Sequence, residues 1–196
     1  MPETTLVAIP PEAVPAGSYG RPEGQGVVMR QISDRSLISV QTSGPHLNDL
    51  ADAVRARFSV ALPASPCLAK GSEVSFLWSG HLQWFAMAAD DRDLLERMHD
   101  LRGVASVSDQ SDARCIVAIS GPKARDTLAK LTPIDLHPRA FKNLQTAATL
   151  FGHISGQITE IAEEPVYELM VFRSFAQSFW SSLLEAGAEY GIRVVR

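Results

Sequence analysis

Histidine is the side chain best suited to acid–base or metal chemistry at neutral pH, and the chain has five. They are His46, His81, His99, His137 and His153. No two of them lie three or four residues apart, so no helix can present a histidine pair to a metal ion. The cysteines, Cys67 and Cys115, do not form a CxxC pair, and neither has a histidine at metal-ligand spacing. The sequence therefore predicts no metal site.

Nucleophilic catalysis needs a nucleophile beside a base, and the motifs that build this arrangement are missing. The sequence has no GxSxG elbow and no HExxH helix. It also lacks the phosphate-binding glycine motifs, because the glycines in 20–26 have no predicted strand before them and no predicted helix after them. We therefore predict no catalytic residue and no cofactor-binding residue in this chain.

The segment 134–141, Ile-Asp-Leu-His-Pro-Arg-Ala-Phe, mixes an acid, an imidazole and a guanidinium with bulky apolar groups. One interpretation is a rigid loop, in which Pro138 restrains His137 to extended angles and the apolar residues anchor the loop to the core. The other is a docking or ligand loop, in which Arg139 binds a carboxylate through its fork of N–H groups. The sequence leaves both open.

Tryptophans are common both in cores and at interface anchors. Trp180 neighbours Phe179 on a predicted helix, which favours the core. Trp78 and Trp84 flank a predicted hairpin turn, and for them core and interface remain equally open. The candidate partner-interface residues are therefore Trp78, Trp84, Asp135, His137, Arg139 and Phe141.

The composition is typical of a soluble globular chain, with 45% hydrophobic and 20% charged residues among 196. A formal net charge of −4 and the lack of any basic run argue against a nucleic-acid binder and a polybasic membrane anchor. The N-terminus lacks the pattern of a signal peptide, and no stretch approaches the ~20 apolar residues of a membrane span. We expect a cytoplasmic protein with both thiols reduced.

The elements that must position these residues fall into two similar halves. In the first half we expect a strand within 27–41, a helix over 47–58, a hairpin of 74–78 and 81–88, a helix between Asp90 and Gly103, and a strand at 104–107. The two-residue turn of that hairpin is predicted at Ser79-Gly80. This order is the split βαβ, or ferredoxin-like, pattern of an antiparallel sheet with two helices on one face.

The second half repeats the order. We expect a strand at 114–119, a helix face at Ala124, Leu128 and Leu131, strands at 146–151, 156–161 and 166–172, a helix capped by Ser174 with Phe175 on its apolar face, and a strand at 192–195. Ser-Gly-Pro tripeptides at Ser43 and Ser120 open equivalent helices, and Asp49 and Asp126 keep the same offset. The predicted class is α+β: a loose N-terminal arm over 1–26, a first ferredoxin-like unit over 27–108 and a second over 109–196, packed together near 105–112.

Several strings in this frame resemble a known family. They are Phe76-Leu-Trp78, Gln83-Trp84, Val107-Ser-Asp109, Ser111-Asp-Ala-Arg114, Ile119-Ser-Gly-Pro122, Ala124-Arg-Asp126 with Leu128, Leu136-His-Pro-Arg-Ala-Phe141, Tyr167-Glu-Leu-Met-Val171, Arg173-Ser-Phe175 and Leu183-Leu-Glu185. Over roughly residues 28–196 the chain is similar to the gamma subunit of heterotetrameric sarcosine oxidase, which is itself related to the folate-binding domain of aminomethyltransferases. The turn Ser79-Gly-His-Leu-Gln83 and the N-terminal arm depart from the family pattern.

The resemblance implies an assembly role in an oxidoreductase that acts on CH–NH groups with oxygen as acceptor. Such complexes demethylate sarcosine to glycine, release hydrogen peroxide and are linked to tetrahydrofolate. It implies alpha, beta and delta partner subunits, with FAD, FMN, NAD and tetrahydrofolate in the partners and none bound by this chain alone. The chain itself is then not catalytic.

Two alternatives stay open. A free-standing folate-binding module of aminomethyltransferase type would need a carboxylate in a cleft between the units, and the candidates are Asp109, Asp126 and Asp135. A subunit of a related N-methyl amino-acid dehydrogenase would differ only in the substrate of its partners.

Overall fold

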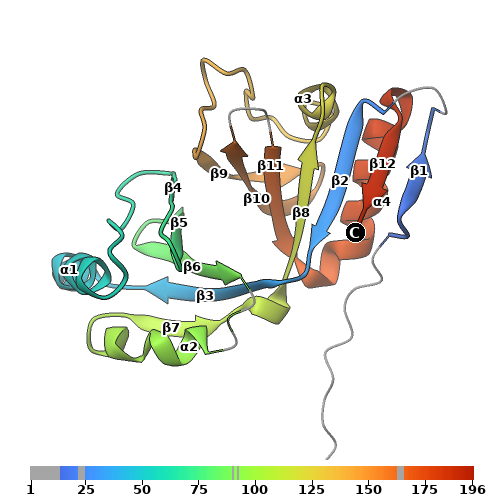
Figure 1. Cartoon of the computed structure of the whole chain (residues 1–196). Helices are drawn as coiled ribbons and strands as arrows, with labels where there is room; N and C mark the ends of the chain where they lie inside the picture. Colours follow the sequence, from blue (N-terminus) through green and yellow to red (C-terminus); the bar gives the residue numbers. More distant parts are fainter. Residues whose placement is uncertain (1–13, 22–24, 90, 92, 163–165) are drawn as a thin grey trace, which may run out of the picture.

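The computed structural model describes residues 14–21, 25–89, 91, 93–162 and 166–196. These residues build two β-sheets that pack against each other, with helices on their outer sides (Figure 1). The predicted α+β class is confirmed. Residues 1–13 and 22–24 of the predicted N-terminal arm lie outside the described residues.

The smaller sheet is antiparallel throughout and has the strand order β4-β5-β6-β3-β7. Its strands are β3 (Arg35–Gln41), β4 (Leu68–Ala69), β5 (Ser75–Gly80), β6 (Gln83–Ala89) and β7 (Ser106–Asp109). Its helices are α1 (Leu47–Phe58), α2 (Leu94–Arg97) and two 3-10 helices, Gly44–His46 and His99–Gly103. With the short β4 set aside, the chain order β3-α1-β5-β6-α2-β7 and this strand order form the predicted ferredoxin-like unit.

The larger sheet has seven strands in the order β1-β12-β2-β8-β11-β10-β9. They are β1 (Gly17–Tyr19), β2 (Val27–Ile32), β8 (Arg114–Ser120), β9 (Thr146–Phe151), β10 (Ile154–Ala162), β11 (Val166–Phe172) and β12 (Ile192–Val195). Helices α3 (Ala124–Leu128) and α4 (Ala176–Gly187) cover its outer face, and three 3-10 helices, Ser111–Ala113, Arg173–Phe175 and Ala188–Tyr190, complete this half.

Strand β2 belongs to the larger sheet, although the predicted first unit of 27–108 includes it. It lies between β8 and β12, where a ferredoxin-like unit would pair its first and last strands directly. It runs antiparallel to β8 and parallel to β12, the single parallel pair in the structure as described. Val27 and Met29 explain the placement, because both are fully buried in the core beneath α3 and α4.

The predicted loose arm also contains regular structure. Gly17–Tyr19 forms β1, which pairs antiparallel with β12 at the edge of the larger sheet. Tyr19 packs against the core, and its hydroxyl donates to the carbonyl of Pro15 at 2.7 Å. This short strand covers the backbone of β12 that would otherwise be an open sheet edge.

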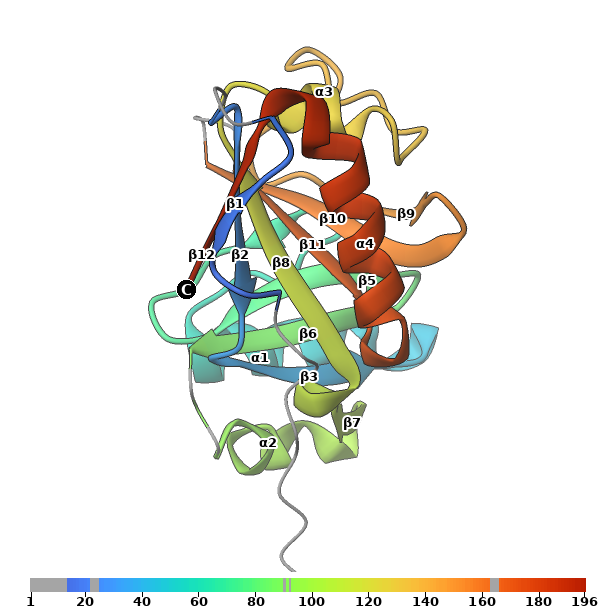
Figure 2. The same ribbon diagram turned by 90° about the vertical axis from the view of Figure 1, so that its right-hand side faces the viewer.

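Alternating side chains divide strands such as β6 and β8 between two cores. In β6, Trp84 and Ala86 pack with α1 and α2, while Phe85 and Met87 face the other sheet. In β8, Val117 packs under α3 and α4. The intersheet core is completed by residues of β2, β3, β4, β5, β8 and β11: Ile32, Leu37, Leu68, Leu77, Ile116, Ala118 and Met170. Figure 2 shows β8 running across the strands of the smaller sheet, so the two sheets pack crosswise.

Two local predictions are wrong. Ser174 does not cap the last helix: it lies inside the 3-10 helix Arg173–Phe175, and α4 starts at Ala176 without a side-chain cap. The hairpin turn lies at His81-Leu82, with Leu82 in the left-handed region at φ 57°, because an irregularity between Trp78 and Gly80 shifts the register. None of the helices in the described ranges has both the length and the apolar character needed to span a membrane.

Candidate functional site

The predicted loop 134–141 is anchored at two points and exposed between them. Leu136 and Phe141 are buried in the core of the larger sheet. The Asp135 carboxylate accepts the backbone N–H of His137 at 2.9 Å, and Nδ1 of His137 accepts the backbone N–H of Arg139 at 3.2 Å. Asp135, His137 and Arg139 are all exposed. The loop is therefore held in one shape and presents three polar side chains to the outside.

The two tryptophans of the hairpin serve the fold. Trp84 is 3% exposed, and its indole N–H donates to the carbonyl of Pro63 at 2.8 Å. Trp78 is partly buried on the same core, and its carbonyl accepts from the side-chain amide of Gln157 at 2.6 Å. Trp84 and Phe141 are thus both buried within this chain, whereas Trp78 is partly buried.

The three carboxylates proposed for a pterin are all engaged locally. Asp109 accepts from the backbone N–H and the hydroxyl of Ser111, at 2.9 and 2.7 Å. Asp126 pairs with Lys123 at 2.8 Å, and Asp135 shapes its own loop. None of these three carboxylates lines any of the cavities described below.

A different carboxylate lies in a cavity between the sheets. Arg35 shares the intersheet side of β3 with Leu37, and Glu168 shares the intersheet side of β11 with Met170. The two ends of the Arg35 guanidinium donate to the two oxygens of Glu168, at 3.0 and 3.4 Å. This bidentate pair lines a cavity of about 320 Å³ together with Lys70, Glu73 and Ile161. A carboxylate held in this way joins the two sheets.

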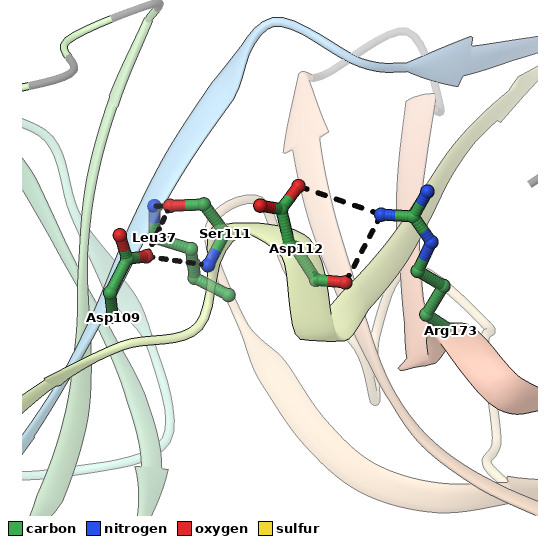
Figure 3. Close-up of polar contacts among 5 residues, drawn as sticks. All are labelled: Leu37, Asp109, Ser111, Asp112 and Arg173. Atoms are coloured by element: carbon green, nitrogen blue, oxygen red, sulfur yellow. Dashed lines mark hydrogen bonds and ion pairs between the residues drawn. The ribbon is translucent and has the colours of Figure 1, made fainter. Parts of the chain in front are cut away.

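The segment that connects the two halves is bonded to both of them (Figure 3). Ser111 accepts the backbone N–H of Leu37, in β3, at 2.9 Å. Asp112 faces Arg173, whose guanidinium donates to the Asp112 carbonyl at 3.3 Å and to its carboxylate at 3.5 Å. The connection is therefore hydrogen-bonded to residues of both halves.

A buried polar cluster lies at the other end of β10 and β11. Arg125 donates to the hydroxyl of Tyr167 at 2.8 Å and lies 3.5 Å from Oε1 of Glu160. Glu160 is 3% exposed, and its other oxygen has no hydrogen-bond partner in the described part of the chain. Burial raises the pKa of Glu160 and Arg125 lowers it by less. Burial likewise raises the pKa of Tyr167.

The sequence predictions missed the exposed apolar residues. Phe172 is 45% exposed, Phe175 is 48% exposed and Leu150 is 49% exposed. Phe175 was expected on the apolar face of the last helix, but it lies in the 3-10 helix before α4 and faces outward. Phe172 ends β11 on the intersheet side, beyond the point where the smaller sheet covers it. Phe172 and Phe175, three positions apart, give this end of the molecule an apolar surface.

Metal and thiol chemistry find no support in the described residues. No group of three or more His, Cys, Asp or Glu side chains there could hold a metal ion. Cys67 and Cys115 are free thiols, and burial raises the pKa of Cys115 to about 11. That thiol stays protonated near neutral pH, which makes it a poor nucleophile.

Comparison with known proteins first places the chain beside a family and one of its relatives. Residues 74–195 match the GCVT N-terminal domain family. An aminomethyltransferase of Chloroherpeton thalassium is 32% identical over 91 residues, covering 44% of this chain. That match covers only 24% of the aminomethyltransferase, so the chain spans about a quarter of the length of this relative.

Two further similarities each cover most of this chain and most of the chain it is compared with. The sarcosine oxidase subunit gamma of an Arthrobacter species is 28% identical over 172 residues, which is 84% of this chain and 81% of that subunit. A chain in the solved structure of heterotetrameric sarcosine oxidase from Corynebacterium sp. U-96 superposes with a TM-score of 0.78. It is 24% identical, and the superposition covers 88% of each chain.

Proposed function

The chain belongs to the GCVT N-terminal domain family, and from this premise we propose that it is the non-catalytic gamma subunit of a heterotetrameric sarcosine oxidase. The observation that carries the proposal is coverage. The similarity to a sarcosine oxidase gamma subunit spans 84% of this chain and 81% of the relative, whereas the aminomethyltransferase match spans 24% of its relative. The similarity therefore extends over most of the gamma subunit and over about a quarter of the aminomethyltransferase.

The packing of polar groups supports a role without turnover. The carboxylates of Glu168, Asp109 and Asp135 are each bound by groups of the chain itself. The Cys115 thiol is buried and protonated. Exposed positions instead hold Phe172 and Phe175, with aromatic surface of the kind that anchors protein interfaces. The proposed task is assembly and stabilisation of the complex.

In this proposal the partners are the alpha, beta and delta subunits. They would hold FAD, FMN, NAD and tetrahydrofolate and demethylate sarcosine to glycine with production of hydrogen peroxide. The exposed loop residues Asp135, His137 and Arg139 remain proposed contacts with a partner, together with the partly buried Trp78. We also propose a cytoplasmic location, because both cysteines are free thiols.

A folate-binding module is the competing proposal, and family membership is the observation that favours it. The cavity beside Glu168, about 320 Å³, is near the lower end of the roughly 300–1,000 Å³ of ligand pockets. Its carboxylate already forms a bidentate pair with Arg35, so a pterin amine would have to share or displace that partner. This favours the assembly role.

Co-expression with the three partner subunits tests the proposal. With an affinity tag on the alpha subunit, this chain should co-purify in stoichiometric amount. The isolated chain should show no sarcosine-dependent oxygen uptake, and titration with tetrahydrofolate should give no saturable change in its tryptophan fluorescence. Failure to co-purify would refute the subunit role, and micromolar tetrahydrofolate binding by the lone chain would favour the folate-binding module.

A further inference from the structure

A second cavity lies beside the segment that connects the two halves, and it is lined mainly by cationic and polar side chains. We call it the junction socket, and its volume is about 210 Å³. Its polar lining consists of Gln31, Ser33, Arg35, Ser111, Asp112, Arg114 and Arg173. Three guanidiniums thus meet one carboxylate in a chain whose formal net charge is −4. The socket is a local site of positive charge on an acidic protein.

The three guanidiniums differ in what they already bind. Arg35 is occupied by both oxygens of Glu168. Arg173 contacts Asp112, but at 3.5 Å and with the Asp112 side chain 81% exposed, so this pair is weak. Arg114 forms no ion pair with any described residue, and its Nε is buried without a hydrogen-bond partner. Arg114 and Arg173 are therefore the donors still available to an anion.

The surroundings of Arg114 keep this charge in place. Arg114 and Phe172 are direct register partners on β8 and β11, and the guanidinium lies 3.7 Å from the centre of the Phe172 ring. It also lies 5.3 Å from the ring of Phe85, in the intersheet core. Burial lowers the pKa of Arg114 from its ordinary value, but an arginine stays protonated at neutral pH. A fixed, partly desolvated cation without a counter-ion favours an incoming anion.

The size of the socket decides between kinds of anion. At about 210 Å³ it is smaller than the roughly 300–1,000 Å³ of pockets that hold drug-sized ligands or cofactors. It has room for one acidic group. The exposed ring of Phe172, stacked on Arg114, adds an apolar surface beside that group. A polypeptide brings both a carboxylate and neighbouring side chains, for which the exposed rings of Phe172 and Phe175 offer apolar area.

We propose that the junction socket binds a single carboxylate presented by a partner polypeptide, with Arg114 and Arg173 as its donors and Phe172 and Phe175 as the apolar rim. The proposal rests on the proposed function, since the partner is a subunit of the assembled complex. Because the socket lies at the connection between the two halves, a partner could bind it only when both halves are folded and packed together.

The test measures how four variants of this chain bind the partner subunits of the complex. Arg114→Gln, Arg173→Gln and Phe175→Ser each change the socket or its rim. Arg57→Gln is the matched control. Arg57 lies on α1, away from the socket, and its side chain is 51% exposed. The assembly of the other subunits, without this chain, is immobilised, and biolayer interferometry follows the dissociation of each variant from it. Each socket variant should weaken binding by about 30-fold or more, mainly through faster dissociation, and the control by less than about 2-fold.

The outcomes separate the two proposals. If the unaltered chain does not join the complex, the proposed function fails. If it joins and the socket variants bind as tightly as it does, the subunit role stands and the socket proposal is overturned. Circular dichroism checks the fold of each variant, and should Arg114→Gln unfold, Arg173→Gln and Phe175→Ser decide alone. Benzoate serves as the free carboxylate probe: micromolar binding to the isolated chain would assign the socket to a small acid and overturn the proposal.

Discussion

Glu160 combines nearly complete burial with one oxygen that has no hydrogen-bond partner among the residues the structure describes. Burial raises its pKa more than Arg125 lowers it, so the folded chain holds the proton more tightly than the unfolded chain does. The contribution of this group to stability is therefore fully present below its unfolded pKa, about 4.3, and is lost as the pH rises through its folded pKa. Ionisation of the Glu160 carboxylate therefore destabilises the folded chain relative to the unfolded chain.

The variant Glu160→Gln should gain stability relative to the unaltered chain as the pH rises from about 4 to about 7. Urea unfolding across this range measures the difference in free energy. Glu189→Gln is the matched control, because hydrogen bonding from Lys130 lowers the pKa of Glu189. Its stability relative to the unaltered chain should fall over the same range. A flat or falling difference for Glu160→Gln would contradict the account.

The two thiols should differ sharply in reactivity. Cys115 is 2% exposed and its pKa is raised to about 11, whereas Cys67 is partly exposed. In a Cys67→Ser variant, a thiol reagent at mildly alkaline pH should modify Cys115 only as fast as the protein unfolds. Absorbance of the released thiolate follows the reaction, with denatured protein as the positive control. Complete modification within seconds under native conditions would show that Cys115 is not enclosed.

At the scale of elements, the ion pair between β3 and β11 joins the two sheets. The side chains of Arg35 and Glu168 are 23% and 13% exposed and meet at two hydrogen bonds. Removing the cation leaves a largely buried carboxylate unpaired. Arg35→Met should therefore lower the free energy of unfolding by about 2–3 kcal/mol in urea titrations.

The exposed pair between Arg57 and Asp100 calibrates that value. Its atoms are 4.0 Å apart and its side chains are 51% and 77% exposed. Arg57→Met should cost less than about 1 kcal/mol. Equal losses for Arg35→Met and Arg57→Met would mean that the intersheet pair contributes no more than a surface contact.

Local patterns predicted most elements but not their partners. The spacing of Leu50, Val54 and Phe58 predicted α1, which spans Leu47–Phe58 as expected. The run 27–32 read as a strand, yet nothing local shows that it would enter the second sheet between β8 and β12. The sheet that this strand joins is determined by contacts of Val27 and Met29 with residues far away in the sequence. The left-handed Leu82 was equally hidden, since leucine does not favour that conformation and Gly80 offered a simpler turn.

The candidate surface was predicted only in part. The exposed positions of Asp135, His137 and Arg139 follow from their polarity, and a buried Phe141 fits an anchored loop. Phe172 and Phe175 are apolar residues in apolar runs, so their exposure depends on where the smaller sheet stops covering β11. The lack of an ion-pair partner for Arg114 among the described residues likewise depends on its tertiary neighbours. The pattern of residue types along the sequence does not reveal these tertiary contacts.

At the scale of the whole molecule, the two halves form one packed unit, and its interior differs in composition from the surface beside the connection. The crossed sheets share a core, and contacts such as Lys70 to the carbonyl of Ile161 at 3.0 Å connect the halves at their rims. Polar pairs such as Arg35–Glu168 and Arg125–Glu160 lie inside the molecule, while aromatic and cationic groups gather beside the connection between the halves. This distribution suits a subunit that offers a rigid surface to its partners.

Native mass spectrometry of the co-expressed assembly tests this claim most directly. The account predicts a complex that contains one copy of this chain with each of the alpha, beta and delta subunits, and no flavin on the chain when it is ejected. An assembly that forms without this chain when it is present in excess, or a lone chain that carries flavin and oxidises sarcosine, would contradict it.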